Sequence, residues 1–103
     1  MGNITVVLKG DNGHYLARCN GCVPGGGDSD SATVHAASPG DGPFAQWTLQ
    51  LQSNGKYTLQ SDSGKYLARC RDCVPGGAYQ DSAFVHTMDP GAAWAQWTIV
   101  LVP

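Results

Sequence analysis

The chain has 103 residues, with six Lys and Arg against eight acidic residues, and a formal net charge of −2 at pH 7. This is the length of one domain, and 42% hydrophobic residues are enough for one modest core. Only 14% of the residues are charged and no Lys/Arg cluster occurs. We therefore expect no nucleic acid as partner. No apolar run reaches the ~18–20 residues of a membrane-spanning helix, so we expect no membrane insertion.

The start of the chain, Met1-Gly2-Asn3, lacks the basic and then apolar stretch of a signal peptide. We therefore expect a cytoplasmic or a non-classically secreted protein. Fourteen Gly and six Pro favour many tight turns and argue against long helices.

Short segments of alternating hydrophobicity, separated by turn residues, predict strands. In the first of them Ile4, Val6 and Leu8 share one face. The Asp/Asn/Gly cluster that follows supplies the positive φ angles that a hairpin requires. No ten-residue segment has the 3.6-residue period of a helix, so the predicted class is all-β. Four strands are expected in the first half of the chain: Ile4–Lys9, His14–Cys19, Ala32–Ala36 and Ala45–Leu51.

The second half repeats the first. Residues 13–26 return as residues 64–77 at an offset of 51, and two later segments return at offsets of 51 and 50. Repeats of this kind are the strongest organisational signal in a sequence. We predict a single domain over residues 1–103, built from two four-stranded repeats, 4–53 and 54–103, with pseudo-two-fold symmetry. The copied strands are Lys56–Gln60, Lys65–Cys70, Ala83–Thr87 and Ala95–Leu101.

The stretch from Trp47 to Leu67 carries a family resemblance. A Trp-containing strand, a second strand, a turn and then Gly-x-Tyr-Leu resemble the fascin-like and actin-crosslinking-like β-trefoil superfamily. The resemblance implies a β-trefoil-like arrangement, but a trefoil has three four-stranded units and this chain has two. Closure by exchange between chains, or an eight-stranded sandwich or barrel, are the other arrangements.

Four cysteines form two C-x-x-C pairs, Cys19 with Cys22 and Cys70 with Cys73. One interpretation is a short disulfide in each repeat. Another is zinc, held by all four cysteines or by each pair together with a His of its own repeat. The third is reduced thiols that pack as small hydrophobic side chains. A thioredoxin-like redox role is not expected, because no helix follows either pair.

The sequence does not favour an enzyme. No nucleophile elbow, metalloprotease motif or phosphate-binding loop occurs. The chain contains no Glu, and its Asp residues lie mostly in turns, where they commonly bind backbone N–H groups. No cofactor is predicted.

The duplicated polar residues predict sugar binding, with one site in each repeat. Carboxylates and imidazoles hydrogen-bond sugar hydroxyls, and an aromatic ring covers apolar C–H groups. Trp47 and Trp97 alternate in phase with aliphatic residues and are predicted to be core. The predicted carbohydrate-binding residues are Arg18, Asp30, His35 and Phe44 in the first repeat, and Arg69, Asp81, His86 and Trp94 in the second.

The function predicted from the sequence is therefore that of a lectin with a glycan ligand. The alternative is a protein-interaction module, either a cytoskeletal crosslinker, by family resemblance, or a protease inhibitor that presents the Val-Pro-Gly-Gly loops. We also expect a homo-oligomer, most simply a dimer. The predicted last strand carries apolar residues on both faces, and such an edge invites pairing with another chain.

Overall fold

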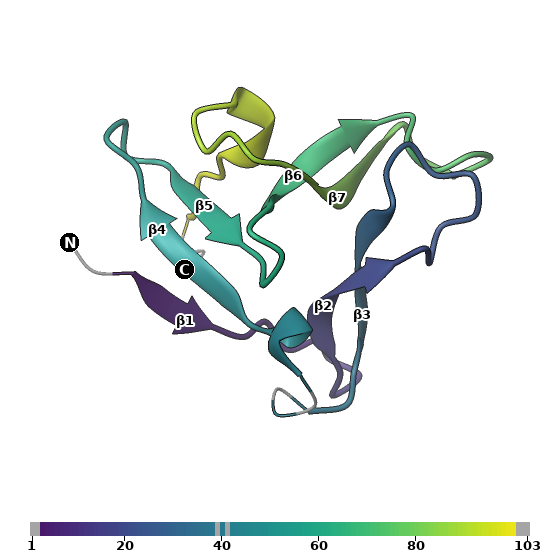
Figure 1. The fold of residues 1–103 in the computed structure, drawn as a ribbon, viewed down its shortest axis with the longest axis horizontal. Helices are drawn as coiled ribbons and strands as arrows, with labels where there is room; N and C mark the ends of the chain where they lie inside the picture. The colour runs from purple at the N-terminus through teal and green to yellow at the C-terminus, as the bar shows by residue number, and fades with distance from the viewer. Residues whose placement is uncertain (1–2, 39, 41, 101–103) are drawn as a thin grey trace.

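The computed structural model describes residues 3–38, 40 and 42–100. It is all-β: seven antiparallel strands form one sheet in the order β1-β4-β5-β6-β7-β3-β2, and the sheet curls into half a barrel (Figure 1). The strands are β1 (Ile4–Val6), β2 (Tyr15–Asn20), β3 (Asp30–Ala36), β4 (Trp47–Leu51), β5 (Tyr57–Gln60), β6 (Tyr66–Arg71) and β7 (Asp81–Thr87).

The two repeats form matching hairpins. In the first repeat β2 pairs with β3 so that Cys19 lies opposite Ser31, and in the second β6 pairs with β7 so that Cys70 lies opposite Ser82. The register shifts once in each hairpin, at equivalent positions directly after the first tyrosine of the strand. The shared sequence thus produces the same pairing twice, down to the irregularity.

The predicted fourth strand of each repeat begins later than expected. Residues Pro43–Ala45 and Ala93–Ala95 form short 3-10 helices, η1 and η2, so Ala45 and Ala95 precede the extended segment. In the second repeat only Trp97 bridges to the sheet, opposite Tyr57, and residues 98–100 are not in a strand. The prediction of an eighth strand over 95–101 is therefore wrong for the described residues, and Leu101 lies outside them.

The first predicted strand is also shorter, because β1 ends at Val6 and beyond it only Lys9 forms a bridge, to Tyr15. The remaining predicted strands shift by one or two residues at their ends. Such differences follow from where hydrogen bonds begin, which hydrophobic alternation does not specify.

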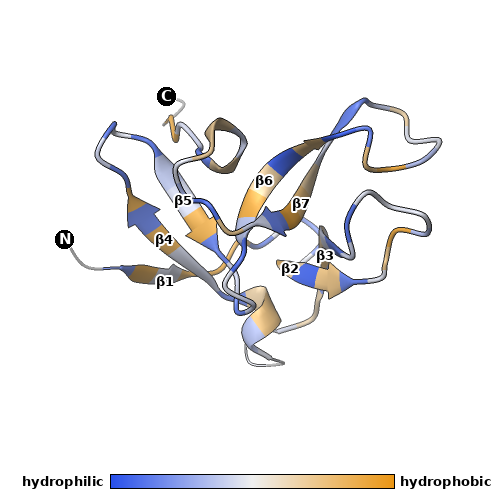
Figure 2. Cartoon of the chain, turned by 45° about the horizontal axis from the view of Figure 1, so that its top comes forward, coloured by the Kyte–Doolittle hydropathy of each residue, from blue (hydrophilic) through white to orange (hydrophobic). Residues whose placement is uncertain are grey.

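The described residues form three buried clusters: one within each repeat, and one between the two repeats. Trp47, Leu67 and Val85 form one buried cluster, and Trp97 packs against it from a partly exposed position. Hydrophobic and hydrophilic residues alternate in bands along β4 and β6 (Figure 2). Trp47 and Trp97 each donate the indole N–H to a backbone carbonyl 3.0 Å away. The acceptor is Leu16 for Trp47 and Leu67 for Trp97. The predicted core role is confirmed for Trp47, which is fully buried, and holds in part for Trp97.

Candidate functional site

One pocket of the second repeat contains three of the predicted site residues. Arg69, His86 and Trp94 line a surface pocket of about 290 Å³ together with Cys70 and Arg71. Arg69 comes from β6, His86 from β7 and Trp94 from η2, so residues spread over 26 positions meet at one surface.

Local structure explains why these side chains point outward. Ala68 of β6 is fully buried, so its neighbour Arg69 faces the opposite side of the strand. In η2 the small residue Ala95 is buried, and Ala92 directly before η2 is buried as well, which leaves the Trp94 ring 46% exposed between them. A large aromatic side chain with this exposure is available to cover the apolar face of a ligand.

Hydrogen bonds fix the polar groups around this pocket. Arg69 Nη1 donates to Asp81 Oδ1 at 3.1 Å, and both side chains are about half exposed. His86 Nε2 donates to the carbonyl of Arg69 at 3.3 Å. The second ring nitrogen, Nδ1, lies 3.9 Å from a carboxylate oxygen of Asp28, which comes from the loop of the first repeat. The hydrogen bond of Nε2 thus orients the imidazole, and Nδ1 makes no hydrogen bond to Asp28 at that distance.

The corresponding residues of the first repeat are bound to one another. Arg18 Nη1 lies 3.3 Å from Asp30 Oδ1, and Asn20 donates to the same oxygen at 2.9 Å. Asp30 is only 7% exposed. Arg18 also makes a two-pronged contact with Asp62, from Nε at 2.8 Å and from Nη2 at 3.1 Å. Asp30 therefore binds Arg18 within the first repeat, and the contact of Arg18 with Asp62 joins the two repeats.

The ion pair between Arg18 and Asp62 shifts the pKa of both side chains. The hydrogen bond from the Arg18 guanidinium lowers the pKa of Asp62 below its ordinary value, and the carboxylate of Asp62 raises the pKa of Arg18. Both shifts favour the charged forms, as expected for an opposite charge within hydrogen-bond distance.

The other two predicted residues of the first repeat contact each other. The rings of His35 and Phe44 are stacked, with centroids 6.0 Å apart and an interplanar angle of 2°. Thr33 Oγ1 lies 2.6 Å from His35 Nδ1. Phe44 therefore packs on the imidazole of His35. In the second repeat, Trp94 and His86 instead line a pocket. The two predicted sites differ in geometry although their sequences match.

The cysteines are paired within each repeat. One disulfide joins Cys19 to Cys22 and another joins Cys70 to Cys73, with Cα atoms 5.7 Å apart in each pair. This geometry favours the disulfide interpretation over reduced thiols. Zinc binds thiolates, and sulfurs in a disulfide do not supply them. Within residues 3–38, 40 and 42–100, no three His, Cys, Asp or Glu side chains gather in a way that could hold a metal ion.

The two disulfide loops pack on each other. Gly27 N–H donates to the carbonyl of Cys73 at 3.0 Å. A Cβ on Gly27 would lie 2.9 Å from the sulfur of Cys73, so this close approach requires glycine. The loops lie side by side at one end of the molecule (Figure 1), and their contact brings Asp28 to His86.

Sequence reasoning missed three residues near these sites. Asp28 lies in a loop with no counterpart acid in the second repeat, and Asp62 and Arg71 belong to a turn and a strand end. A signal existed only for Asp62, since the turn residues of the two repeats align it with Asp11. The contacts of Asp28 and Arg71 depend on how the loops pack, which the repeat pattern does not contain.

Comparison of the chain with protein-family models, with curated proteins and with solved structures finds no match. The resemblance to the β-trefoil superfamily therefore stays a prediction. In the described part of the chain, no helix has the length and apolar character needed to cross a membrane.

Proposed function

We propose that this chain is a non-catalytic carbohydrate-binding protein and that the pocket of the second repeat is its main sugar site. The observation that carries the proposal is the meeting of Trp94, His86 and Arg69 around one open pocket. Ligand sites are typically concave surfaces with an aromatic wall and a few oriented polar groups. This pocket is small, but it has an aromatic wall in Trp94 and polar groups in His86 and Arg69.

Each group has a role that its chemistry fits. The half-exposed ring of Trp94 covers the apolar C–H face of a sugar. His86, oriented by the carbonyl of Arg69, offers a ring nitrogen to a hydroxyl. Asp28 and Asp81 do not line the pocket, but their carboxylates lie next to His86 and Arg69, and a carboxylate accepts hydrogen bonds from the hydroxyls of a ligand that extends past the lining. A neutral, hydroxyl-rich ligand suits these groups.

The same proposal assigns the first repeat a weaker site or none. The guanidinium of Arg18 already binds both Asp30 and Asp62, and Phe44 packs on His35. Asp30 is also buried, whereas the equivalent pair Arg69–Asp81 is about half exposed. Binding there would have to break contacts that stabilise the fold, so its cost is higher. We propose in addition that the chain works as a homo-oligomer, most simply a dimer, because weak single sites gain strength when several bind together.

A glycan array tests the proposal, followed by titration of the best binder into two matched variants. Trp94→Ala should weaken binding about 3- to 10-fold, the value of one aromatic contact. Phe44→Ala, at the equivalent position, should leave the affinity within twofold. If Phe44→Ala abolishes binding and Trp94→Ala does not, the site lies in the first repeat. If the folded protein binds no glycan on the array, the function is wrong.

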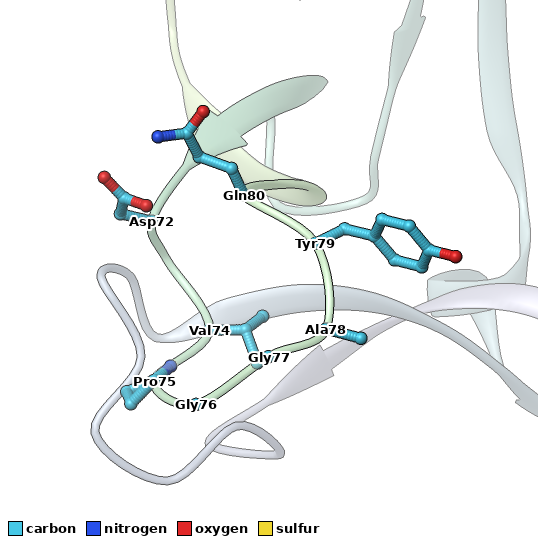
Figure 3. Close-up of a pocket in the computed structure, with 8 residues that line it drawn as sticks. All are labelled: Asp72, Val74, Pro75, Gly76, Gly77, Ala78, Tyr79 and Gln80. Carbon is cyan, nitrogen blue, oxygen red and sulfur yellow. The ribbon is translucent and has the colours of Figure 1, made fainter.

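One observation favours the alternative of a protein-interaction module. The second Val-Pro-Gly-Gly loop surrounds a pocket of about 410 Å³, and Tyr79 on its rim is 85% exposed. The Tyr79 ring points away from the loop and into solvent (Figure 3). An exposed tyrosine on a surface loop is typical of a protein contact. Tyr79→Ala should leave glycan binding unchanged if the sugar proposal holds, and should reduce capture of a protein partner if the alternative holds.

A further inference from the structure

The two repeats meet at a contact with two parts. Strand β4 of the first repeat pairs with β5 of the second, with Leu49 opposite Leu59 and Gln50 opposite Thr58. Next to this pairing, Arg18 of the first repeat binds Asp62 in the first turn of the second. The contact therefore combines a strand pair with an ion pair.

The repeat offsets show that both halves of a second such contact are present on the chain. The counterpart of Asp62 is Asp11, and the counterpart of Arg18 is Arg69. In the same way Leu8 corresponds to Leu59, and Ile99 corresponds to Leu49. Leu8 and Asp11 belong to one half of this contact, and Arg69 and Ile99 belong to the other.

The two halves do not pair with each other within the described chain, and their apolar side chains are exposed. Ile99 is 53% exposed and Val100 is 71% exposed, while Val7 and Leu8 are about 40% exposed. Their counterparts Leu49 and Leu59 are both partly buried in the contact between the repeats. The four exposed residues are apolar, which is costly to leave in water along a sheet edge.

The charged side chains of the two halves, Asp11 and Arg69, also have fewer partners than their counterparts Asp62 and Arg18. Within the described residues, Asp11 forms no ion pair, whereas Asp62 forms a two-pronged one. Arg69 binds Asp81 through Nη1 alone, and its side chain is 55% exposed against 22% for Arg18. An acidic turn and a basic side chain with matching sequence surroundings thus both lack the partner that their copies have.

We propose that a second copy of this chain fills these places, so that residues 98–100 of one protomer pair antiparallel with residues 7–9 of its partner. The register copies that of β4 and β5: Ile99 faces the partner's Leu8, and Val100 faces the partner's Val7. Arg69 then binds the partner's Asp11 as Arg18 binds Asp62. Two half-barrel sheets thereby close on each other.

Self-association fits better than a different partner because one chain carries both complementary halves. When each protomer offers both, a two-fold axis forms the contact twice and leaves neither half free, so assembly stops at a dimer. The charges also match, since one half carries Asp11 and the other half carries Arg69. In this dimer Arg69 binds the partner's Asp11 as Arg18 binds Asp62, so Trp94 and His86 are the groups of the pocket that bind a ligand.

Sedimentation of the full chain at micromolar concentration tests the assembly. The wild type should sediment at twice 10.8 kDa. Ile99→Lys places a charge opposite the partner's Leu8, at the position that the partly buried Leu49 has in the contact between the repeats, and should weaken the dimer at least tenfold. Its matched control is Met88→Lys, at a residue 65% exposed and outside residues 7–9 and 98–100, and this variant should remain dimeric. A monomeric wild type, or an Ile99→Lys variant that stays fully dimeric, overturns the proposal.

Charge reversal tests the register. Arg69→Asp and Asp11→Arg should each weaken the dimer several-fold, because each places like charges together at both copies of the contact. The double variant should regain most of the wild-type affinity. If it is as weak as the sum of the single variants, Arg69 and Asp11 do not meet. These measurements involve no sugar. They can therefore disprove the dimer while the proposed sugar binding stands, and the glycan array can disprove sugar binding while the dimer stands.

Discussion

Arg18 and Arg69 are the same residue of the same motif in two surroundings. Arg18 binds two carboxylates and is 22% exposed, while Arg69 binds one and is 55% exposed. The difference does not come from their own repeats, whose hairpins share one register. It comes from the neighbour, because the first repeat has a second repeat after it and the second repeat has none in the described chain.

This comparison shows how a duplicated sequence can hold a structural group in one copy and a functional group in the other. Where a following repeat supplies Asp62, the arginine joins two units. Where no such turn follows, the same arginine lines an open pocket with Trp94. Replacement of Phe44 by Trp94 at the equivalent position strengthens the difference, since Phe44 packs on His35.

The largest expected effect separates the two equivalent tryptophans. Trp47 is fully buried and Trp97 only partly, so Trp47→Ala should lower the free energy of unfolding by about 3–5 kcal/mol, and Trp97→Ala by less. Urea denaturation followed by circular dichroism measures both. Equal losses would show that the second repeat encloses its tryptophan as completely as the first.

The second prediction separates the arginines. Arg18→Ala leaves the buried carboxylate of Asp30 with Asn20 as its remaining side-chain partner, and should cost about 1–3 kcal/mol of unfolding free energy. Arg69→Ala removes an exposed pair and should cost within about 1 kcal/mol. Both are compared at a protein concentration where each variant is monomeric. A larger loss for Arg69→Ala contradicts the account.

The third prediction concerns the contact between the disulfide loops. Gly27→Ala places a methyl group 2.9 Å from the sulfur of Cys73, and should cost about 1–3 kcal/mol. The equivalent residue of the second repeat is already alanine, and Ala78→Gly should cost far less. Thermal unfolding of the two variants under oxidising conditions measures the difference. If Gly27→Ala unfolds at the wild-type temperature, the loops do not pack as described.

The smallest expected effect is on pH dependence. The pKa of Asp62 is lowered in the folded state, so its contribution to stability is present above its unfolded pKa, near 3.8, and is lost as the pH falls through the lower folded value. Asp62→Asn should therefore reduce the loss of stability in acid, by within about 1 kcal/mol. Asp72→Asn, at a side chain 72% exposed, is the control and should leave the acid profile unchanged.

Much of the fold could be predicted from the sequence. Alternation and turn residues gave the all-β class and the centres of seven strands, because these features act locally. The eighth strand could not be predicted correctly, since Trp97 has a strand partner in Tyr57 while residues 98–100 have none in the described chain. Hydrophobic alternation reports that a segment could pair, and pairing also needs a neighbour.

The candidate site was predictable residue by residue only in part. The repeat identified Arg69, His86 and Trp94 as candidates, and the structure brings them to one pocket. The same reasoning placed Arg18 and Asp30 in an equivalent site, where Arg18 instead binds Asp62 of the other repeat and Asp30 is buried. A repeat pattern cannot distinguish these outcomes, because contacts between the repeats decide them.

The most direct test of the difference between the repeats is the number of sugar molecules bound by each chain. Nuclear magnetic resonance titration with the best glycan from an array follows the indole N–H of Trp94 and the ring protons of His86 and His35. The account predicts one molecule per chain at saturation, with shifts at Trp94 and His86 and none at His35. Two equivalent molecules per chain, with equal shifts at His35 and His86, would contradict it.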